Sequence, residues 1–102
     1  MLVPRRTAAA EADLQEIAFQ IAVRDQRPVT ADCVIEELIQ QCEQLARNSK
    51  TSIQGTAASE VGKDVRLLSY RRWVIIFRYE PQGVVVLRFA DGSQDYLSWK
   101  LS

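Results

Sequence analysis

The side chains best suited to chemistry are five arginines in the second half of the chain: Arg66, Arg71, Arg72, Arg78 and Arg88. Guanidinium groups bind carboxylates and phosphates through paired hydrogen bonds. Residues 1–48 carry five arginines against eight acidic residues, whereas residues 49–102 carry eight basic against five acidic residues. Two interpretations stay open, namely ordinary solvated faces or a basic groove that accepts an acidic partner.

The residue types that are missing exclude several kinds of chemistry. The chain has no histidine, so no imidazole can serve as base, acid or metal ligand. Cys33 and Cys42 lie about 13 Å apart along one predicted helix, beyond the ~7 Å reach of a disulfide. Without histidine or a CxxC spacing we predict no metal site and no cofactor.

Length and composition predict one globular domain over residues 1–102. Apolar residues make up 47% and charged residues 25% of the 102 positions, and the formal net charge is zero. A neutral chain argues against direct DNA binding through bulk positive charge. The most apolar run, residues 73–77, is far shorter than a membrane span, and no apolar segment follows the MLVPRR start. We therefore expect a cytoplasmic protein.

Hydrophobic periodicity predicts two helices in the first half of the chain. Residues 8–25 place apolar side chains on one face, and Pro28 should end this helix by about Arg27. Thr30 is a suitable N-cap for a second helix from Ala31 to about Arg47. The short connection between them predicts an antiparallel helical hairpin.

The last third is typical of a small antiparallel β-sheet, which makes the fold class α+β. Segments 64–70, 72–80 and 83–91 are rich in β-branched and aromatic residues, and residues 48–63 form a polar connection. The middle strand is apolar on both faces. The hairpin can cover one face. The other needs a short N-terminal strand, the C-terminal tail or a partner, for which a second copy of the chain is one choice.

Two stretches resemble the RelE/ParE superfamily of toxins from type II toxin–antitoxin, or plasmid stabilization, systems. AEADLQEIAFQIAVRD resembles the opening helix of that superfamily, and DVRLLSYRRWVIIFRYEPQGVVVLRFADGSQDY resembles its C-terminal meander. The likeness spans roughly residues 3 to 96. It implies the same helical hairpin and sheet that the periodicity predicts.

The superfamily contains two activities, and the site residues must distinguish them. RelE-like members cut messenger RNA in the ribosome, whereas ParE-like members are not nucleases and act on DNA gyrase. The arginine that RelE-like toxins place after the first aromatic of the middle strand is matched by Val74, and Asp91-Gly92 stands where many ParE-like members have His-Gly. A nuclease could use only Arg66, Arg71, Arg72 and Tyr96, a set without a base.

The segment RRWVIIFRYE looks more like the ParE-type strand, so the resemblance implies a gyrase-directed toxin, not an enzyme, that a small antitoxin encoded alongside it neutralises. The residues expected to bind the antitoxin are Arg71, Arg72, Trp73, Arg78 and Arg88. Tyr96 and Trp99 are expected to form a target-binding tail, although Trp99 could instead fold back onto the helices. An inactive relative of the toxins is a third interpretation.

Overall fold

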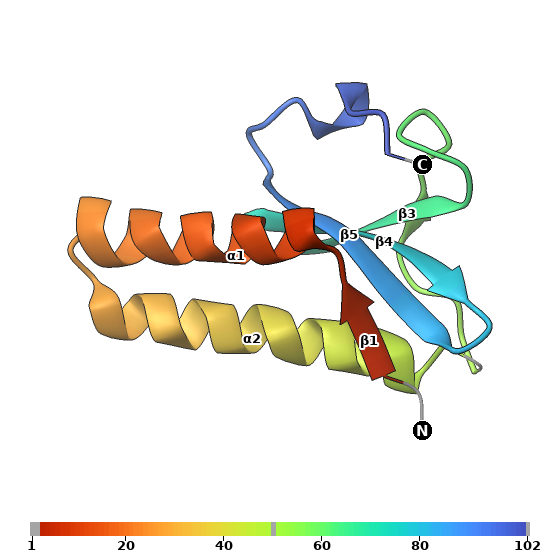
Figure 1. Cartoon of the computed structure of the whole chain (residues 1–102), viewed down its shortest axis with the longest axis horizontal. Helices are drawn as coiled ribbons and strands as arrows, with labels where there is room; N and C mark the ends of the chain where they lie inside the picture. The colour runs from red at the N-terminus through yellow and green to blue at the C-terminus, as the bar shows by residue number, and fades with distance from the viewer. Residues whose placement is uncertain (1–2, 50, 102) are drawn as a thin grey trace.

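A computed structural model describes residues 3–49 and 51–101. Two antiparallel helices lie against a five-stranded mixed sheet, and the C-terminal segment folds over the sheet from the other side (Figure 1). The elements in chain order are β1 (Val3–Arg6), α1 (Ala8–Phe19), the π-helical turn η1 (Gln20–Arg24), α2 (Pro28–Arg47), β2 (Thr56–Ala57), β3 (Val65–Tyr70), β4 (Trp73–Glu80), β5 (Gly83–Asp91) and the 3-10 turn η2 (Tyr96–Ser98).

The helical hairpin confirms the periodicity, but its boundaries differ from the prediction. Thr7 caps α1, because its hydroxyl accepts the Ala10 N–H at 3.1 Å while donating to the Leu87 carbonyl at 2.7 Å. α2 begins at Pro28, so the assignment of Thr30 as its N-cap was wrong. Proline fits the first helical position because no intrahelical partner is required for the N–H it lacks.

The sheet has the order β1-β5-β4-β3-β2 and is larger than the predicted three-stranded meander. β3, β4 and β5 form that meander, while β1 lies parallel to β5 and β2 antiparallel to β3. Both added strands are at the edges and short, with four and two residues. Pro4 in β1 cannot donate to a strand ladder, which suits an edge position. Segments this short carry too little periodicity to be identified from sequence.

The apolar residues of β4 and β5 divide between two cores, one on each face of the sheet. The helices cover one face, where Ile75 and Phe77 are completely buried, whereas Ile76 is completely buried on the other face. The second core is closed by residues of the 58–65 connection and by the C-terminal tail: Ala58, Val61, Val65, Tyr96, Trp99 and Leu101. Of the covers expected from sequence, the tail is thus the one used, and Trp99 packs on the sheet and not on the helices.

A glycine allows the tail to close this second core. The Leu101 N–H donates to the Val61 carbonyl at 2.6 Å, which brings the tail backbone onto Gly62. A Cβ atom at Gly62 would lie 1.5 Å from the Leu101 carbonyl oxygen. Because this oxygen belongs to the backbone, no rearrangement of a side chain could relieve the clash. The backbone approach therefore requires glycine for steric reasons.

The two cysteines are separate thiols, as the spacing predicted. Cys33 is exposed and Cys42 is fully buried in the helix-side core. Burial raises the pKa of the Cys42 thiol to about 12. This thiol is therefore protonated and inert near neutral pH.

We predict that Gly62→Ala releases the tail without unfolding the domain. Hydrogen exchange of the Leu101 amide should accelerate by about tenfold or more, because the tail opens locally. Exchange measured by NMR, with exposed Glu60→Ala as the matched control, tests this. A Leu101 amide that exchanges at the same rate in both variants would contradict the steric role of Gly62.

Candidate functional site

The turn between β3 and β4 presents two arginines beside the helical hairpin. Arg71 adopts a positive φ of 56°, which allows a two-residue connection between paired Tyr70 and Trp73. The Arg71 guanidinium lies 3.1 Å from a Glu37 carboxylate oxygen, and the Tyr70 hydroxyl donates to the same carboxylate. Glu37 thus ties the tip of the sheet to α2. The Arg71 side chain is nevertheless 64% exposed.

Arg72 pairs with the loop that follows β5. Its guanidinium lies 2.7 Å from Asp91, which also accepts the Ser93 N–H and hydroxyl. The Ser93 N–H and then Arg72 hold the pKa of Asp91 below its ordinary value. The carboxylate therefore adds stability above the ordinary carboxyl pKa, and this stability is lost as the pH falls through the lower, folded-state value. Asp91 thus organises the turn that follows β5.

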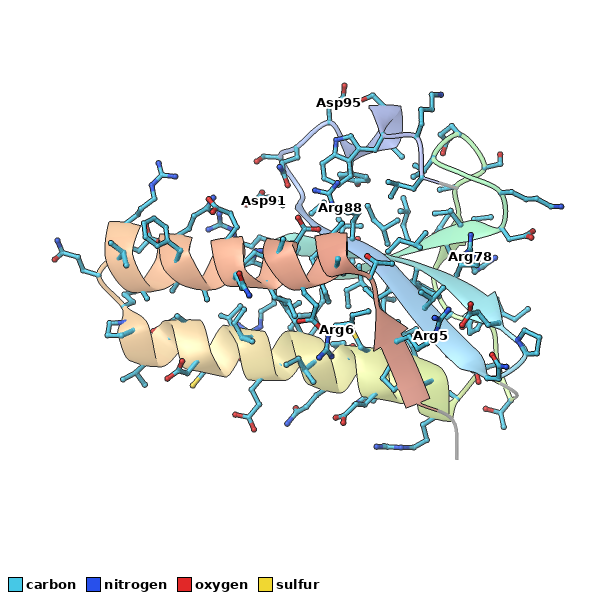
Figure 2. The ribbon with its side chains drawn as sticks, viewed as in Figure 1. Arg5, Arg6, Arg78, Arg88, Asp91 and Asp95 are labelled. Carbon is cyan, nitrogen blue, oxygen red and sulfur yellow. The ribbon has the colours of Figure 1, made fainter. Side chains whose placement is uncertain are left out.

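Arg88 lies between α1 and the C-terminal segment (Figure 2). Its guanidinium donates to both Asp13 oxygens, at 2.6 and 3.0 Å, and lies 4.3 Å from the centre of the Trp99 ring. Asp13 also accepts the Phe89 N–H at 2.9 Å. One half-buried arginine therefore joins α1, β5 and the tail. The hydrogen bond with Asp13 raises the pKa of Arg88 further.

The other two arginines of the predicted groove, Arg66 and Arg78, lie at the end of β3 and β4 that is far from the Arg71–Arg72 turn. Arg66 donates to the carbonyls of Gln54 and Gly55, each at 2.8 Å, and so fixes the connection that precedes β3. Arg78 is half-buried, is flanked across the sheet by Val65 and Val85, and makes no ion pair with any residue in 3–49 or 51–101.

The structure therefore does not gather the five arginines into one continuous groove. Arg66 lies near the start of β3 and Arg71 directly after its end, five positions apart, which is about 16 Å at the usual strand rise. Arg71 and Arg72 are exposed together at the turn, whereas Trp73 is only 6% exposed and belongs to the helix-side core. Of the residues predicted to bind an antitoxin, only Arg71 and Arg72 are both adjacent and exposed.

The tail residues selected from sequence are mainly packing residues. Tyr96 and Trp99 are half-buried against the second core. The large apolar side chain that the tail exposes is Leu97, at 47%. Sequence analysis missed Leu97 because no periodicity within so short a turn distinguishes the covered side from the open one.

A second feature that sequence analysis missed is the open edge of β3. β2 pairs only with Arg66 and Leu67, so Leu68–Tyr70 lack a strand neighbour on that side among the described elements. A small pocket adjoins this edge and is lined by Leu45 and Leu68 together with four amide side chains: Gln41, Gln44, Asn48 and Gln54. An extended segment could add to the sheet there. The open edge leads directly into the turn that carries Arg71 and Arg72.

Within 3–49 and 51–101, no cluster of three or more potential metal ligands is present. None of the helices in the described ranges is long and apolar enough to cross a membrane.

These features define an α+β domain. Most of its arginine–carboxylate pairs connect the helical hairpin, the mixed sheet and the C-terminal tail to one another. The sequence matches the model for the ParE toxin of type II toxin-antitoxin system, parDE, over residues 5–96. The chain belongs to this ParE toxin family, which confirms the resemblance. Trp99 and Leu101 lie beyond the matched residues.

A solved structure supports the fold. It is described as "Chromosomal ParDE TA system from P. aeruginosa", and it matches with a TM-score of 0.71 over 89% of this chain and 96% of that chain. The sequence identity is 22%, so this likeness concerns the fold alone. No curated protein matches the sequence.

We predict that Asp13→Asn destabilises the domain more than Glu80→Gln. Both carboxylates make paired hydrogen bonds with an arginine, but Asp13–Arg88 is mostly buried, whereas the Arg5 partner of Glu80 is 66% exposed. Leaving Arg88 half-buried without its counter-charge should cost about 1–3 kcal/mol in unfolding free energy. The exposed pair should contribute less than about 1 kcal/mol. Urea unfolding followed by circular dichroism measures both, and equal losses would contradict this ranking.

Proposed function

We propose that this ParE-family toxin acts by binding DNA gyrase and inhibiting it, and that a cognate antitoxin neutralises it by binding along the β3 edge and the Arg71–Arg72 turn. The alternatives are a RelE-like ribonuclease and an inactive relative. We assign no catalytic residue, because the proposed toxin acts by binding another protein.

The observation that carries this choice is the dispersal of the residues a nuclease would need. Arg66 is held by loop carbonyls, Arg71 and Arg72 lie at the other end of β3, and Tyr96 packs in the second core. A catalytic site for RNA cleavage requires a base, an acid and a charge stabiliser around one phosphate. The four candidates do not surround a common point, which favours a protein that acts through binding.

The antitoxin-binding surface is proposed from backbone geometry and charge. An extended segment beside Leu68–Tyr70 would extend the sheet through backbone hydrogen bonds. At the end of that edge, acidic side chains of the segment would meet Arg71 and Arg72, which are 64% and 60% exposed. Their present carboxylate partners are half-buried, but the arginine of each pair is exposed to solvent, so exchanging one carboxylate for another costs little.

The double variant Arg71→Glu, Arg72→Glu should weaken binding of the antitoxin encoded alongside this chain by about tenfold or more, because reversed charges repel an acidic segment. Arg47→Glu, an exposed arginine in the last turn of α2, is the matched control. Calorimetric titration with the purified antitoxin measures the effect. Equal affinities of the double variant and the control would place the antitoxin elsewhere.

The tail is proposed as the surface that meets gyrase. Tyr96 and Trp99 pack against the second core and give the tail an apolar base, and Leu97 beside them is 47% exposed. Apolar anchors on a well-packed base are typical of residues that dominate protein interfaces. Arg88 holds this base in place through the Trp99 ring.

Purified toxin should inhibit gyrase supercoiling and trap cleaved DNA, while the same protein leaves messenger RNA intact in a translating extract. Leu97→Ala should raise the inhibitory concentration by about tenfold, as expected for loss of one interface anchor. Val29→Ala is the matched control, because Val29 is also exposed but lies at the start of α2. Cut RNA with normal gyrase would establish the ribonuclease alternative, and no effect in either assay would establish the inactive one.

A further inference from the structure

The open edge of β3 is short, so side chains must supply most of what it recognises. Only Leu68–Tyr70 lack a strand neighbour on that side among the described elements. Backbone pairing over so few residues gives little affinity after the cost of ordering an extended segment is subtracted. The selectivity of this edge therefore depends on the side chains that lie beside it.

The pocket beside the edge has no charged group in its lining. Its volume is about 130 Å³, and its walls are Leu45, Leu68 and four amide side chains. Leu45 is 2% exposed and Leu68 packs against the helix-side core, so together they supply its apolar surface. Gln41, Gln44 and Asn48 are spaced by three and four positions at the end of α2 and share one face of the helix. Their amides offer both donors and acceptors of hydrogen bonds.

The same face of the sheet carries Tyr70, two residues further along β3. Leu68 and Tyr70 both pack against the helix-side core, as the alternation of a strand requires. The Arg71 guanidinium lies 5.7 Å from the centre of the Tyr70 ring and pairs with Glu37 of α2. In an added strand, the side chains opposite Leu68 and Tyr70 would point to this face as well. One of them would enter the pocket, and the other would meet Arg71.

A glutamine side chain fits the pocket position. Its methylene stem can lie on the two leucines, while its amide head exchanges hydrogen bonds with the amides of Gln41 and Gln44. A charged side chain would lose water there without meeting an opposite charge, which is costly. The pocket therefore favours a neutral amide over a carboxylate or an ammonium group.

An acidic side chain fits the second position. The Arg71 side chain is 64% exposed, and its contact with Glu37 is made by the Nη2 atom. Other N–H groups of the guanidinium can bind a second carboxylate. Because Glu37 and the Tyr70 ring restrain the arginine before the partner arrives, less conformational entropy is lost on binding.

The direction of the sheet sets the order of these two positions. β3 pairs antiparallel with both β2 and β4. A segment that runs in the direction of β2 passes Tyr70 first and Leu68 two residues later. Its sequence is therefore an acidic residue, any residue and glutamine.

We propose that the open β3 edge selects an extended partner segment with the order acidic residue, any residue, glutamine, in which the acidic residue pairs with Arg71 and the glutamine fills the pocket of α2 amides. This inference rests on the proposed antitoxin site, and it names the side-chain chemistry by which that site chooses its partner.

The test uses the full chain and short synthetic peptides with Glu-Ser-Gln at their centre. We expect this peptide to bind in an NMR titration and to shift the Leu68 methyl groups and the Gln41 side-chain amide. Lysine in place of the glutamate, glutamate in place of the glutamine, or the reversed order Gln-Ser-Glu should each weaken binding by about tenfold. No binding of the first peptide, equal affinities across the set, or shifts at another surface would overturn the proposal.

A charge placed in the pocket gives an independent readout. Gln41→Glu should weaken binding of the first peptide by about tenfold and strengthen, by a similar factor, binding of a peptide with lysine in place of the glutamine. Gln40→Glu, which adds the same charge at an exposed neighbouring position outside the pocket, should change neither affinity. Because a damaged fold cannot gain affinity for the lysine peptide, the absence of that gain would show that the pocket does not read this side chain.

Calorimetric titration with the purified antitoxin separates failure of this inference from failure of the proposed antitoxin site. If Arg71→Glu with Arg72→Glu weakens antitoxin binding but Gln41→Glu leaves it unchanged, the site stands and the selected sequence is wrong. If none of these changes affects antitoxin binding, the site itself fails, and this inference with it.

Discussion

The constraint on which the structure depends is that the central strand β4 is apolar on both faces. Ile75 and Ile76 are neighbours that point to opposite sides of the sheet, and both are completely buried. Burying both sides of one strand requires two covers. The helical hairpin provides the first cover and the tail with the 58–65 connection provides the second. The close approach at Gly62 and the position of Trp99 both follow from this need.

Hydrogen bonds and ion pairs of arginine side chains hold the loops and the tail, which the apolar cores alone do not fix. Arg88 joins α1 to the tail, Arg72 holds the loop after β5, and Arg66 holds the connection before β3. Each is thus a structural tie between segments distant in sequence. This use of arginines explains why a basic half-chain does not produce a basic groove. It also explains why the exposed, adjacent pair at the β3–β4 turn stands out as a surface for an acidic partner.

The same reasoning separates two surfaces with different chemistry. The β3 edge offers backbone groups that lead to two arginines, whereas the tail exposes an apolar side chain beside residues packed on the second core. A small domain can therefore offer surfaces of different charge to different partners.

The sequence by itself determined the helical hairpin, the meander of β3 to β5, the separate cysteines and the family, because these depend on local periodicity and ordered motifs. It did not determine the edge strands β1 and β2, whose few residues carry no period, or the start of α2 at Pro28. Only the tertiary structure decided which arginine side chains stay exposed. Whether Arg88 faces a partner or Asp13, 75 positions away in sequence, depends on how the helix packs on the sheet, and no local pattern records that contact.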